Sequence, residues 1–377
     1  MKYEYTHLIP ENVAPKGAER IVVMKMDENG NPVKEVCSIP AARFGGLTPP
    51  AGKPAYRFIV TSDPHLNTSI YTDRTAGYKS VLTYTNQDED CKFTVVCGDL
   101  VDNGLVQEQT DNYRAVVTST AQKPVYAIAG NHDTIWGYPT DEHMESYTVD
   151  CTGHGYPHYY AVAHTADEAN RFYGNADVTE GDLLIFLGHY GKDHSGGGGD
   201  WRGGELFSTE ELAWFEAVMA ANQDKRRMVF IHPYIPDTAG DPPLTITPPN
   251  EPPDLWTKKS TVTTDAGADF LRILDRYPGA LVVNGHSHYR FRTQEEQSKA
   301  IVYKPPSGNY IIIHSPSPTK LRDVRNGKRY DLDASMTDYG GEGFIVDVYD
   351  DCTYFRGMDF VNDVWVGIGT YRIEVTA

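Results

Sequence analysis

The stretch Phe93-Thr94-Val95-Val96-Cys97-Gly98-Asp99 is a short apolar run that ends abruptly on an acid. Runs of β-branched and aromatic residues without polar alternation are typical of strands covered on both faces, as in parallel sheets. Four other apolar runs along the chain also end on Asp, Asn or His. Because open sheets hold their ligands just beyond the carboxyl ends of the strands, these polar residues are expected to meet on one rim. In chain order they are Asp63 and His65, Asp99, Asn131-His132-Asp133, His232, and His286 with His288.

Taken together, these residue types supply the ligands of a two-metal centre that cleaves phosphoesters. Two divalent cations about 3.5–4 Å apart can clamp a phosphoryl group, lower the pKa of a shared water and neutralise charge on the attacking and leaving oxygens. Imidazole and carboxylate ligands suit Mn, Fe, Zn, Co and Ni, and none of the strand-end sets offers a thiolate. All of these metals are compatible with the sequence.

The order and spacing of the strand-end residues resemble the calcineurin-like metallophosphoesterase family. The resemblance covers residues 55–315 and implies a four-layer α/β/β/α sandwich of two mixed sheets, with the metal site at the carboxyl ends of the strands. Residues 1–50 lie outside it. The motifs that carry it are Asp63-x-His65, Gly98-Asp99, Gly130-Asn131-His132-Asp133, a lone His232 and Gly285-His286-x-His288.

The resemblance divides the expected ligands between two metal ions that share the carboxylate of Asp99. The implied reaction is hydrolysis of a phosphodiester or phosphomonoester by in-line attack of a metal-bridging hydroxide. Besides Asp99, the first ion would be held by Asp63, His65 and His288, and the second by Asn131, His232 and His286.

His132 has a different role in the family pattern, because it faces the scissile phosphate and is not a ligand. A side chain that titrates near neutrality can protonate the leaving oxygen or stabilise charge in the transition state. The family pairs this histidine with an acid that follows the bridging aspartate, and here Asp102 stands in that place. A carboxylate on the far ring nitrogen of His132 would fix its tautomer and raise its pKa.

Two positions depart from the serine/threonine protein phosphatase branch of the family. In that branch an arginine that grips phosphate follows the acid, and the histidine motif ends in glutamate, whereas this chain has Asn103 and Asp133. Because asparagine lacks the charge and the paired donors of an arginine fork, a protein phosphatase of that branch is not expected. Four other cations each follow a predicted strand and are candidates for the missing role: Lys192, Arg290, Arg292 and Lys304.

The composition is that of a globular protein of 377 residues with a formal net charge of −18. Binding of long polyanions depends on Lys and Arg, so the acidic balance favours a small phosphoester substrate over a long nucleic acid. No apolar stretch approaches the roughly 20 residues that cross a bilayer, so no membrane association is expected. The first residues lack the charged start and apolar centre of a secretory signal, which predicts a cytoplasmic location.

Two parts of unequal size are expected. Residues 1–50 should form a small β-hairpin extension with a linker, because Asn29-Gly30 is a hairpin-turn signal between two apolar runs. Residues 51–377 should form the catalytic domain. Inserts within that domain are expected near residues 139–160, 188–205 and 233–256.

The inserts are where substrate specificity is expected to lie. The second is rich in Gly and the third in Pro, and the third leaves directly from the ligand His232. A long loop rooted at a ligand can cover a pocket or contact the substrate, although it can equally form an oligomer contact. Three aromatic residues are candidates for stacking on a base or sugar: Trp136, Tyr234 and Trp256.

Helices are expected to alternate with the strands and to cover the sheets. Apolar residues at helical spacing predict three of them, over 78–85, 106–121 and 264–277. Ser208-Thr209-Glu210-Glu211 is a capping box, which predicts that a fourth helix begins there.

The tail of the chain alternates like paired antiparallel strands. The expected strands cover residues 343–349, 352–360 and 371–375. Together with residues 310–313, they are expected to form the second sheet of the fold.

Among enzymes, a small-molecule phosphodiesterase or phosphomonoesterase is the first prediction, and a metal-dependent nuclease is the alternative. The same fold can also serve as a non-catalytic binding scaffold when its site decays. The complete ligand set favours an enzyme. Stoichiometric transition metal in the purified protein would separate an enzyme from a scaffold.

Overall fold

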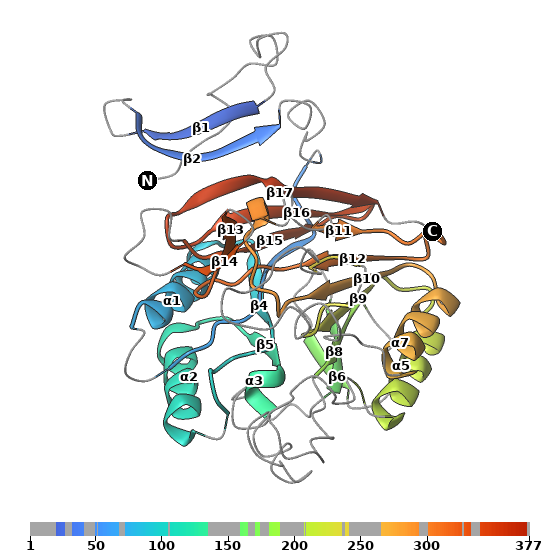
Figure 1. Ribbon diagram of the computed structural model, residues 1–377. Coiled ribbons are helices and arrows are strands. Elements are labelled where there is room, and N and C mark those ends of the chain that lie inside the picture. The colour runs from blue at the N-terminus through green and yellow to red at the C-terminus, as the bar shows by residue number, and fades with distance from the viewer. Residues whose placement is uncertain are drawn as a thin grey trace.

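The structure is a computed structural model in which two mixed β-sheets lie face to face and helices cover the outer face of each (Figure 1). The four-layer α/β/β/α sandwich expected from the sequence is therefore confirmed. The structure describes residues 20–26, 32–40, 50, 52–67, 72–104, 106–134, 159–164, 170–173, 181–188, 207, 209–235, 238–240, 265–293, 301–325, 328–332 and 340–374.

The first sheet has six strands. In spatial order they are β17 (Val364–Glu374), β16 (Cys352–Asp359), β15 (Glu342–Val348), β3 (Tyr56–Thr61), β4 (Cys91–Cys97) and β5 (Val125–Ile128). Strands β3, β4 and β5 are parallel, while β15, β16 and β17 continue the sheet from β3 in antiparallel fashion. Each of the three parallel strands is followed by one of the predicted ligand motifs.

The second sheet has seven strands. In spatial order they are β11 (Val302–Tyr303), β12 (Tyr310–His314), β10 (Ala280–Asn284), β9 (Arg227–Ile231), β8 (Asp182–Leu187), β6 (Tyr159–His164) and β7 (Asn170–Tyr173). The four central strands, β12, β10, β9 and β8, are parallel, and the strands outside them are antiparallel. Strand β9 ends just before His232, and β10 ends two residues before His286.

The division of strands between the sheets differs from the prediction. The tail strands do not form a second sheet with residues 310–313, because β15 pairs with β3 while β12 pairs with β10. The ligand-bearing strands are also divided, with β3, β4 and β5 in one sheet and β9 and β10 in the other. The rim on which the motifs meet is therefore shared by two sheets. Apolar runs did not reveal this, since strands of both sheets are buried on both faces.

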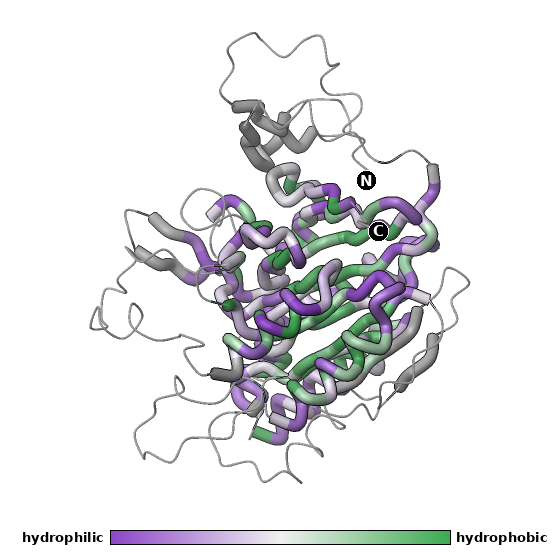
Figure 2. Tube along the Cα trace, turned by 90° about the vertical axis from the view of Figure 1, so that its right-hand side faces the viewer, coloured by the Kyte–Doolittle hydropathy of each residue, from purple (hydrophilic) through white to green (hydrophobic). Residues whose placement is uncertain are grey.

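Aromatic side chains fill the space between the sheets. Phe58 and Phe93 stack with ring centroids 4.9 Å apart, and Phe186 and Phe230 stack at 5.0 Å. Phe58 meets Phe230 edge-on at 6.3 Å, which joins the two sheets. All four rings are fully buried, and each contributes about 1.5–3 kcal/mol by leaving water. Figure 2 shows the hydrophobic residues concentrated on the strands inside the body.

Four helices cover the sheets where the sequence predicts them. Helix α1 begins at Thr72, before the predicted residue 78; the apolar pattern did not reveal its first turns because they contain few apolar residues. Ser208 of the predicted capping box lies outside the described residues. The helices α1 (Thr72–Gln87) and α2 (Gln107–Thr120) lie on the first sheet, and α5 (Thr209–Ala221) and α7 (Asp265–Arg276) on the second (Figure 1).

Among the described residues, two small hairpins form two-stranded sheets separate from the large ones. Strands β1 (Arg20–Met26) and β2 (Pro32–Pro40) pair antiparallel, and β2 contacts β17 (Figure 1). The strands agree with the predicted hairpin, although its Asn29-Gly30 turn lies outside the described residues. Strands β13 (Arg322–Arg325) and β14 (Lys328–Asp331) form the other hairpin.

The predicted domain boundary at residue 50 stays a prediction. The inserts near 139–160, 188–205 and 233–256 lie almost wholly outside the described residues. None of the described helices combines the length and apolar composition needed to cross a membrane.

Candidate metal centre

Left-handed backbone turns carry most of the predicted ligands. Of the described residues other than glycine, six have a positive φ, and five of these are predicted ligands. Such a conformation costs about 1–3 kcal/mol, although Asp and His adopt it more readily than most residues. Hydrogen bonds between turns stabilise it, because the N–H of Asp63 donates to Gly98 O at 2.9 Å and that of His65 to Asp99 O at 3.0 Å. The five ligands are Asp63 (φ 56°), His65 (45°), Asp99 (51°), His286 (74°) and His288 (61°).

Gly98 lets the turn after β4 approach a ligand from the other sheet. Its φ is +81°, and a Cβ there would lie 2.6 Å from Nδ1 of His232. The His232 ring packs directly on this turn, where Nδ1 donates to Cys97 O at 2.7 Å. Both the backbone conformation and the ring therefore require glycine before Asp99.

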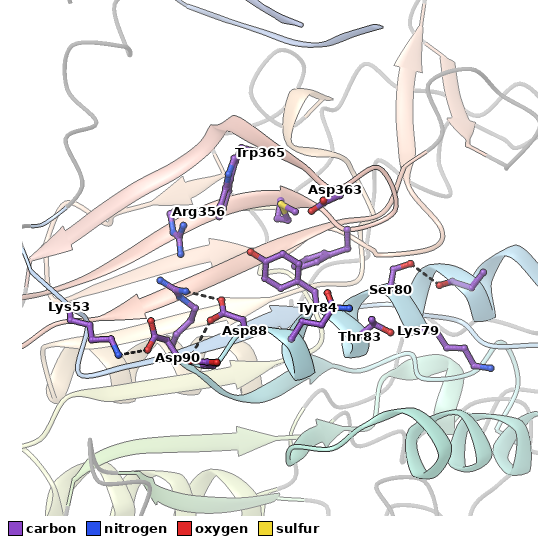
Figure 3. A pocket seen from close by; sticks show the side chains of 16 residues that line it. Lys53, Lys79, Ser80, Thr83, Tyr84, Asp88, Asp90, Arg356, Asp363 and Trp365 are labelled. Atoms are coloured by element: carbon purple, nitrogen blue, oxygen red, sulfur yellow. Dashed lines mark hydrogen bonds and ion pairs between the residues drawn. The ribbon is translucent and has the colours of Figure 1, made fainter. Parts of the chain in front are cut away.

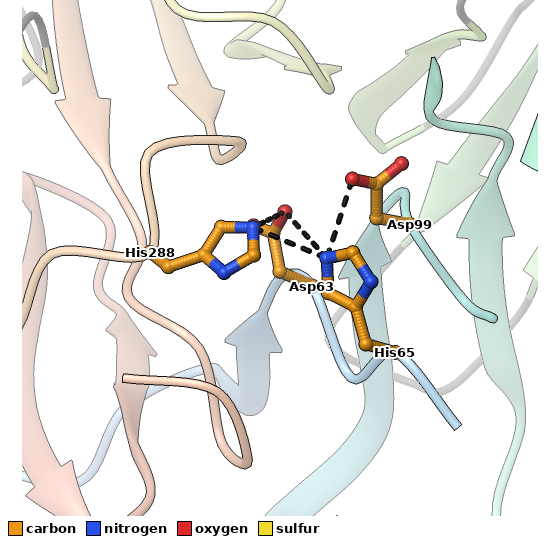
Figure 4. Close-up of side chains that lie close together, drawn as sticks. All are labelled: Asp63, His65, Asp99 and His288. Carbon is orange, nitrogen blue, oxygen red and sulfur yellow. Dashed lines mark hydrogen bonds and ion pairs between the residues drawn. The ribbon is translucent and has the colours of Figure 1, made fainter. Parts of the chain in front are cut away.

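Four side chains from both sheets converge in a first cluster, formed by Asp63, His65, Asp99 and His288 (Figure 4). Nε2 of His288 lies 3.0 Å from Asp63 Oδ1, and Nε2 of His65 lies 3.4 Å from Asp99 Oδ2. The two Nε2 atoms are 3.1 Å apart. All four side chains are buried. This is the set that the resemblance assigns to the first metal ion.

A second cluster shares Asp99 with the first and adds His232 and His286. Nε2 of His232 lies 3.3 Å from Asp99 Oδ2 and 3.1 Å from His286 Nδ1. The same nitrogen is 3.0 Å from Oδ1 of Asn131. Asp99 Oδ2 thus faces both clusters, as a bridging ligand must. The structure brings all seven predicted ligands together at the edge shared by the two sheets.

In His65 and His288, the hydrogen bond made by Nδ1 determines that the lone pair of the neutral ring lies on Nε2. Nδ1 of His65 donates to Asp102 Oδ1 at 2.9 Å, and Nδ1 of His288 donates to Lys320 O at 3.2 Å. Because these acceptors carry no proton, each neutral ring has its lone pair on Nε2, inside the cluster. Burial, followed by the charge of Lys320, holds the pKa of His65 well below its usual value, so this ring is neutral. Two such lone pairs 3.1 Å apart repel unless a cation or a proton lies between them.

Each ligand carboxylate has one oxygen fixed by the backbone and one turned to the ring nitrogens. Asp63 Oδ2 accepts from the N–H of His286 at 2.8 Å, and Asp99 Oδ1 accepts from the N–H of His132 at 2.7 Å. Asp63 Oδ1 and Asp99 Oδ2 are buried and accept no hydrogen bond of good geometry from the described residues. A buried oxygen without a donor is destabilising, and a cation would compensate it. The donor atoms therefore fit metal ions of the expected kind.

Metal binding is expected to release a proton from His232. Burial acts to lower the pKa of this ring, but the negative charge of Asp99 outweighs burial and raises it to about 9. The metal-free ring is protonated at pH 7.5, so a metal must displace that proton to reach Nε2. Metal affinity should therefore rise about tenfold per pH unit between pH 6 and 9. Burial raises the pKa of Asp63 to about 6, so a second proton must leave at lower pH and the slope should steepen there.

Titration calorimetry of Mn²⁺ binding at pH 7.5 measures this release directly. In two buffers with different ionisation enthalpies, the heats should differ by the amount that about one released proton produces. His232→Asn should remove the difference while the first cluster still binds Mn²⁺. Equal heats for the wild type in both buffers would contradict the displacement of a proton.

His132 lies beside the clusters, but its orienting partner differs from the prediction. Nδ1 of His132 donates to the backbone carbonyl of Asp102 at 2.7 Å. The Asp102 carboxylate instead accepts from His65 and, at 2.6 Å, from NH1 of Arg74. The predicted pairing of this carboxylate with His132 is therefore wrong, because other donors occupy both its oxygens. The carbonyl still fixes the tautomer and leaves Nε2 of His132 to reach a substrate.

Asp133 joins the turn after β4 to the turn after β5. Its carboxylate accepts from the N–H of Gly130 at 2.6 Å and from those of Leu100 and Val101 at 3.1 Å. Three backbone donors thus fix the spacing between two ligand-bearing turns. In the sequence, Asp133 appeared as part of the strand-end motif and as a departure from the protein phosphatase branch, but this bracing role was not predicted.

The structure describes three of the four cations that the sequence offered for binding phosphate. Nε of Arg290 lies 3.4 Å from Oε1 of the buried Glu342, and Arg292 and Lys304 are exposed. Lys192 lies outside the described residues. Sequence reasoning missed the cations that contact ligands or their partners, which are Arg74, Lys320 and Arg322.

Of the three aromatic residues predicted to stack on a base or sugar, the structure describes Tyr234. Tyr234 is buried, and its ring centroid lies 5.4 Å from that of His286. The tyrosine thus packs on a predicted ligand. Trp136 and Trp256 lie outside the described residues.

A cavity of about 1170 Å³ lies elsewhere, between α1 and strands β16 and β17 (Figure 3). It contains an ion pair between Lys53 and Asp90 at 2.7 Å, and the guanidinium of Arg356 lies 4.5 Å from the centroid of the Trp365 ring. None of the predicted metal ligands lines it. The chemistry of the ligand clusters, and not cavity size, therefore identifies the candidate site.

Two solved structures have a similar fold. One is a dimetal phosphatase from Danio rerio, with a TM-score of 0.55 and 12% sequence identity, covering 86% of this chain and 100% of its own. The other is the purple acid phosphatase PPD1 from yellow lupin (Lupinus luteus) seeds, with a TM-score of 0.52 and 14% identity, covering 92% of this chain and 58% of its own. At these identities the likeness concerns the fold alone. A search of curated protein sequences found no match.

The family is identified from the sequence. The family model described as calcineurin-like phosphoesterase matches residues 56–290. This range is more than half of the chain and contains all seven predicted ligands. The resemblance that the strand-end motifs indicated is thereby confirmed, and this chain belongs to the calcineurin-like phosphoesterase family.

Proposed function

We propose that this protein is a two-metal phosphoesterase that hydrolyses a small phosphodiester or phosphomonoester by in-line attack of water on phosphorus. One observation carries the proposal: histidine ring nitrogens face two clusters that share one oxygen of Asp99. When bound, two metal ions would lower the pKa of a shared water and neutralise charge on the phosphoryl oxygens. The residues that would hold them are Asp63, His65, Asp99, Asn131, His232, His286 and His288.

His132 would contribute in two ways, by positioning Asp99 and by donating a proton. The N–H of His132 holds Asp99 Oδ1, so Oδ2 stays between the clusters. The Asp102 carbonyl accepts from Nδ1 of the same histidine and so orients the ring; when the ring is in its doubly protonated form, Nε2 also carries a proton, which it can donate to the leaving oxygen. His132 directly follows the ligand Asn131, which supports a place next to the phosphoryl group.

Two features favour a small-molecule enzyme over the alternatives. The net charge of −18 opposes binding of long nucleic acids, which supports a small substrate over a nuclease role. Five ligands held in costly backbone conformations support a working site over a non-catalytic scaffold, because such strain persists where function uses it.

The proposal is tested with the full chain, stripped of metal by EDTA and reloaded with Mn²⁺. We expect hydrolysis of p-nitrophenyl phosphate or bis(p-nitrophenyl) phosphate, a fall in rate of at least about 100-fold on stripping, and recovery on reloading. Metal analysis should give about two ions per chain. Bound metal without hydrolysis of either ester would overturn the proposal in favour of a scaffold. Hydrolysis of single-stranded DNA alone would overturn it in favour of a nuclease.

A further inference from the structure

The loop after β12 lies against the segment that carries the first ligands. Oγ of Ser317 donates to Asp63 O at 2.7 Å, and Oγ1 of Thr319 donates to Pro64 O at 2.6 Å. Oγ of Ser317 also accepts from the backbone N–H of Lys320 at 2.8 Å. Because Ser317 and Thr319 are buried, these bonds fix the backbone of Lys320 next to the first cluster.

The ammonium of Lys320 is largely buried and has no hydrogen-bond acceptor among the described residues. Its side chain is 16% exposed, and Nζ lies 3.6 Å from Oδ1 of Asp102, which is beyond hydrogen-bond distance. No hydrogen bond joins Nζ to any of the described residues. An ammonium whose donors lack acceptors is destabilising in a buried position. A ligand that supplies oxygen atoms would satisfy it.

Asp102 does not need Lys320 as its counter-ion. The carboxylate accepts from His65 Nδ1 at 2.9 Å, from Arg74 NH1 at 2.6 Å and from Asn67 Nδ2 at 3.1 Å. The guanidinium of Arg74 already neutralises its charge. Lys320 is therefore not required to neutralise Asp102.

Lys320 and His132 contact the same residue. The backbone carbonyl of Asp102 accepts from His132, and its carboxylate is the acid nearest to the Lys320 ammonium. Both side chains are thus held next to Asp102, whose carboxylate also orients the ligand His65. Asn103, the residue after Asp102, has no charge with which to bind phosphate there.

We propose that Lys320 binds a non-bridging oxygen of the substrate phosphoryl group and makes the enzyme prefer phosphomonoesters to phosphodiesters. This proposal rests on the proposed function and narrows its substrate class. A monoester dianion has one more negative charge and one more unesterified oxygen than a diester. An ammonium that is held near the metals and largely screened from water stabilises that additional charge.

The test compares esters and phosphate binding in the full chain loaded with Mn²⁺. The wild type should have a kcat/KM for p-nitrophenyl phosphate at least about tenfold above that for bis(p-nitrophenyl) phosphate. Lys320→Met should weaken binding of inorganic phosphate, measured by calorimetry, by about 10- to 100-fold. KM for the monoester should rise similarly, with metal content unchanged and diester turnover changed less than about threefold. Lys320→Arg should retain most of the phosphate affinity.

Lys79→Met is the matched control, because Lys79 is an exposed lysine on α1 outside the ligand clusters. Unchanged phosphate affinity and ester preference in metal-loaded Lys320→Met would overturn the proposal and leave Lys320 as a structural charge. A wild type that prefers the diester would also overturn it, and this measurement decides the matter if Lys320→Met does not fold. If the wild type hydrolyses neither ester, the proposed function fails, while phosphate binding to the wild type and to Lys320→Met still tests Lys320.

Discussion

Replacing Asp99 by asparagine is expected to lower kcat/KM by at least about 1000-fold, because an amide cannot bridge two cations as a carboxylate does. Asp99 Oδ2 lies 3.4 Å from Nε2 of His65 and 3.3 Å from Nε2 of His232, so it serves both clusters. The variant should bind fewer than two metal ions per chain. Steady-state kinetics and metal analysis on the same preparation measure both effects.

Asp347→Asn is the matched control for this variant. Asp347 is also a buried carboxylate of the first sheet, but its oxygens pair with Arg57 at 2.5 Å and Arg356 at 2.8 Å. The control should lower the melting temperature and leave metal content unchanged, with kcat/KM within about twofold of wild type at 25 °C. Near-normal turnover by rigorously purified Asp99→Asn would refute the bridging role.

Replacing His132 by alanine is expected to lower kcat by about 10²- to 10⁴-fold without loss of metal. The backbone N–H that holds Asp99 Oδ1 is retained in the variant, so the ligand clusters should keep their geometry. If the imidazole protonates the leaving oxygen, the loss should be larger for phenyl phosphate than for p-nitrophenyl phosphate, since nitrophenolate leaves readily without a proton. Kinetics on the two esters, with metal analysis, measure this difference.

Two outcomes would assign His132 a different role. Loss of bound metal from His132→Ala would make it a ligand. Equal loss of rate on both esters would show that the imidazole stabilises charge on the phosphoryl group and does not transfer a proton to the leaving oxygen.

The ligands could be predicted because each depends on local sequence. A buried strand fixes the direction of the chain, and an Asp or His one to five residues beyond its end must lie at the rim. Asp63 after β3 and Asp99 after β4 follow this rule. The family motifs then divide the residues between two ions. All seven ligands could therefore be predicted from the sequence, but the division of their strands between two sheets could not.

Other features depend on contacts between distant segments. Which sheet β12 and β15 join depends on the strands with which they pair. A strand that is buried on both faces has a uniformly apolar sequence, so its pattern does not indicate its neighbours. The acceptor of the His132 ring could not be read from the chain, because Arg74 of α1 draws the Asp102 carboxylate away from it. Lys320 was missed for a similar reason. Its polar segment also follows a buried strand, but only the hydrogen bonds of the loop place it beside the centre.

The left-handed turns at Asp63, Asp99 and His286 bear on how such a chain could lose its activity during evolution. Gly and Asn adopt this backbone region at low cost, whereas Val, Ile or Thr would disrupt the turn as well as remove the ligand. Descendants that abandon hydrolysis but keep the fold should therefore carry Gly or Asn at these three positions. Relatives that have lost the activity would then be recognisable from Gly or Asn at these positions of their sequences, before any assay is run.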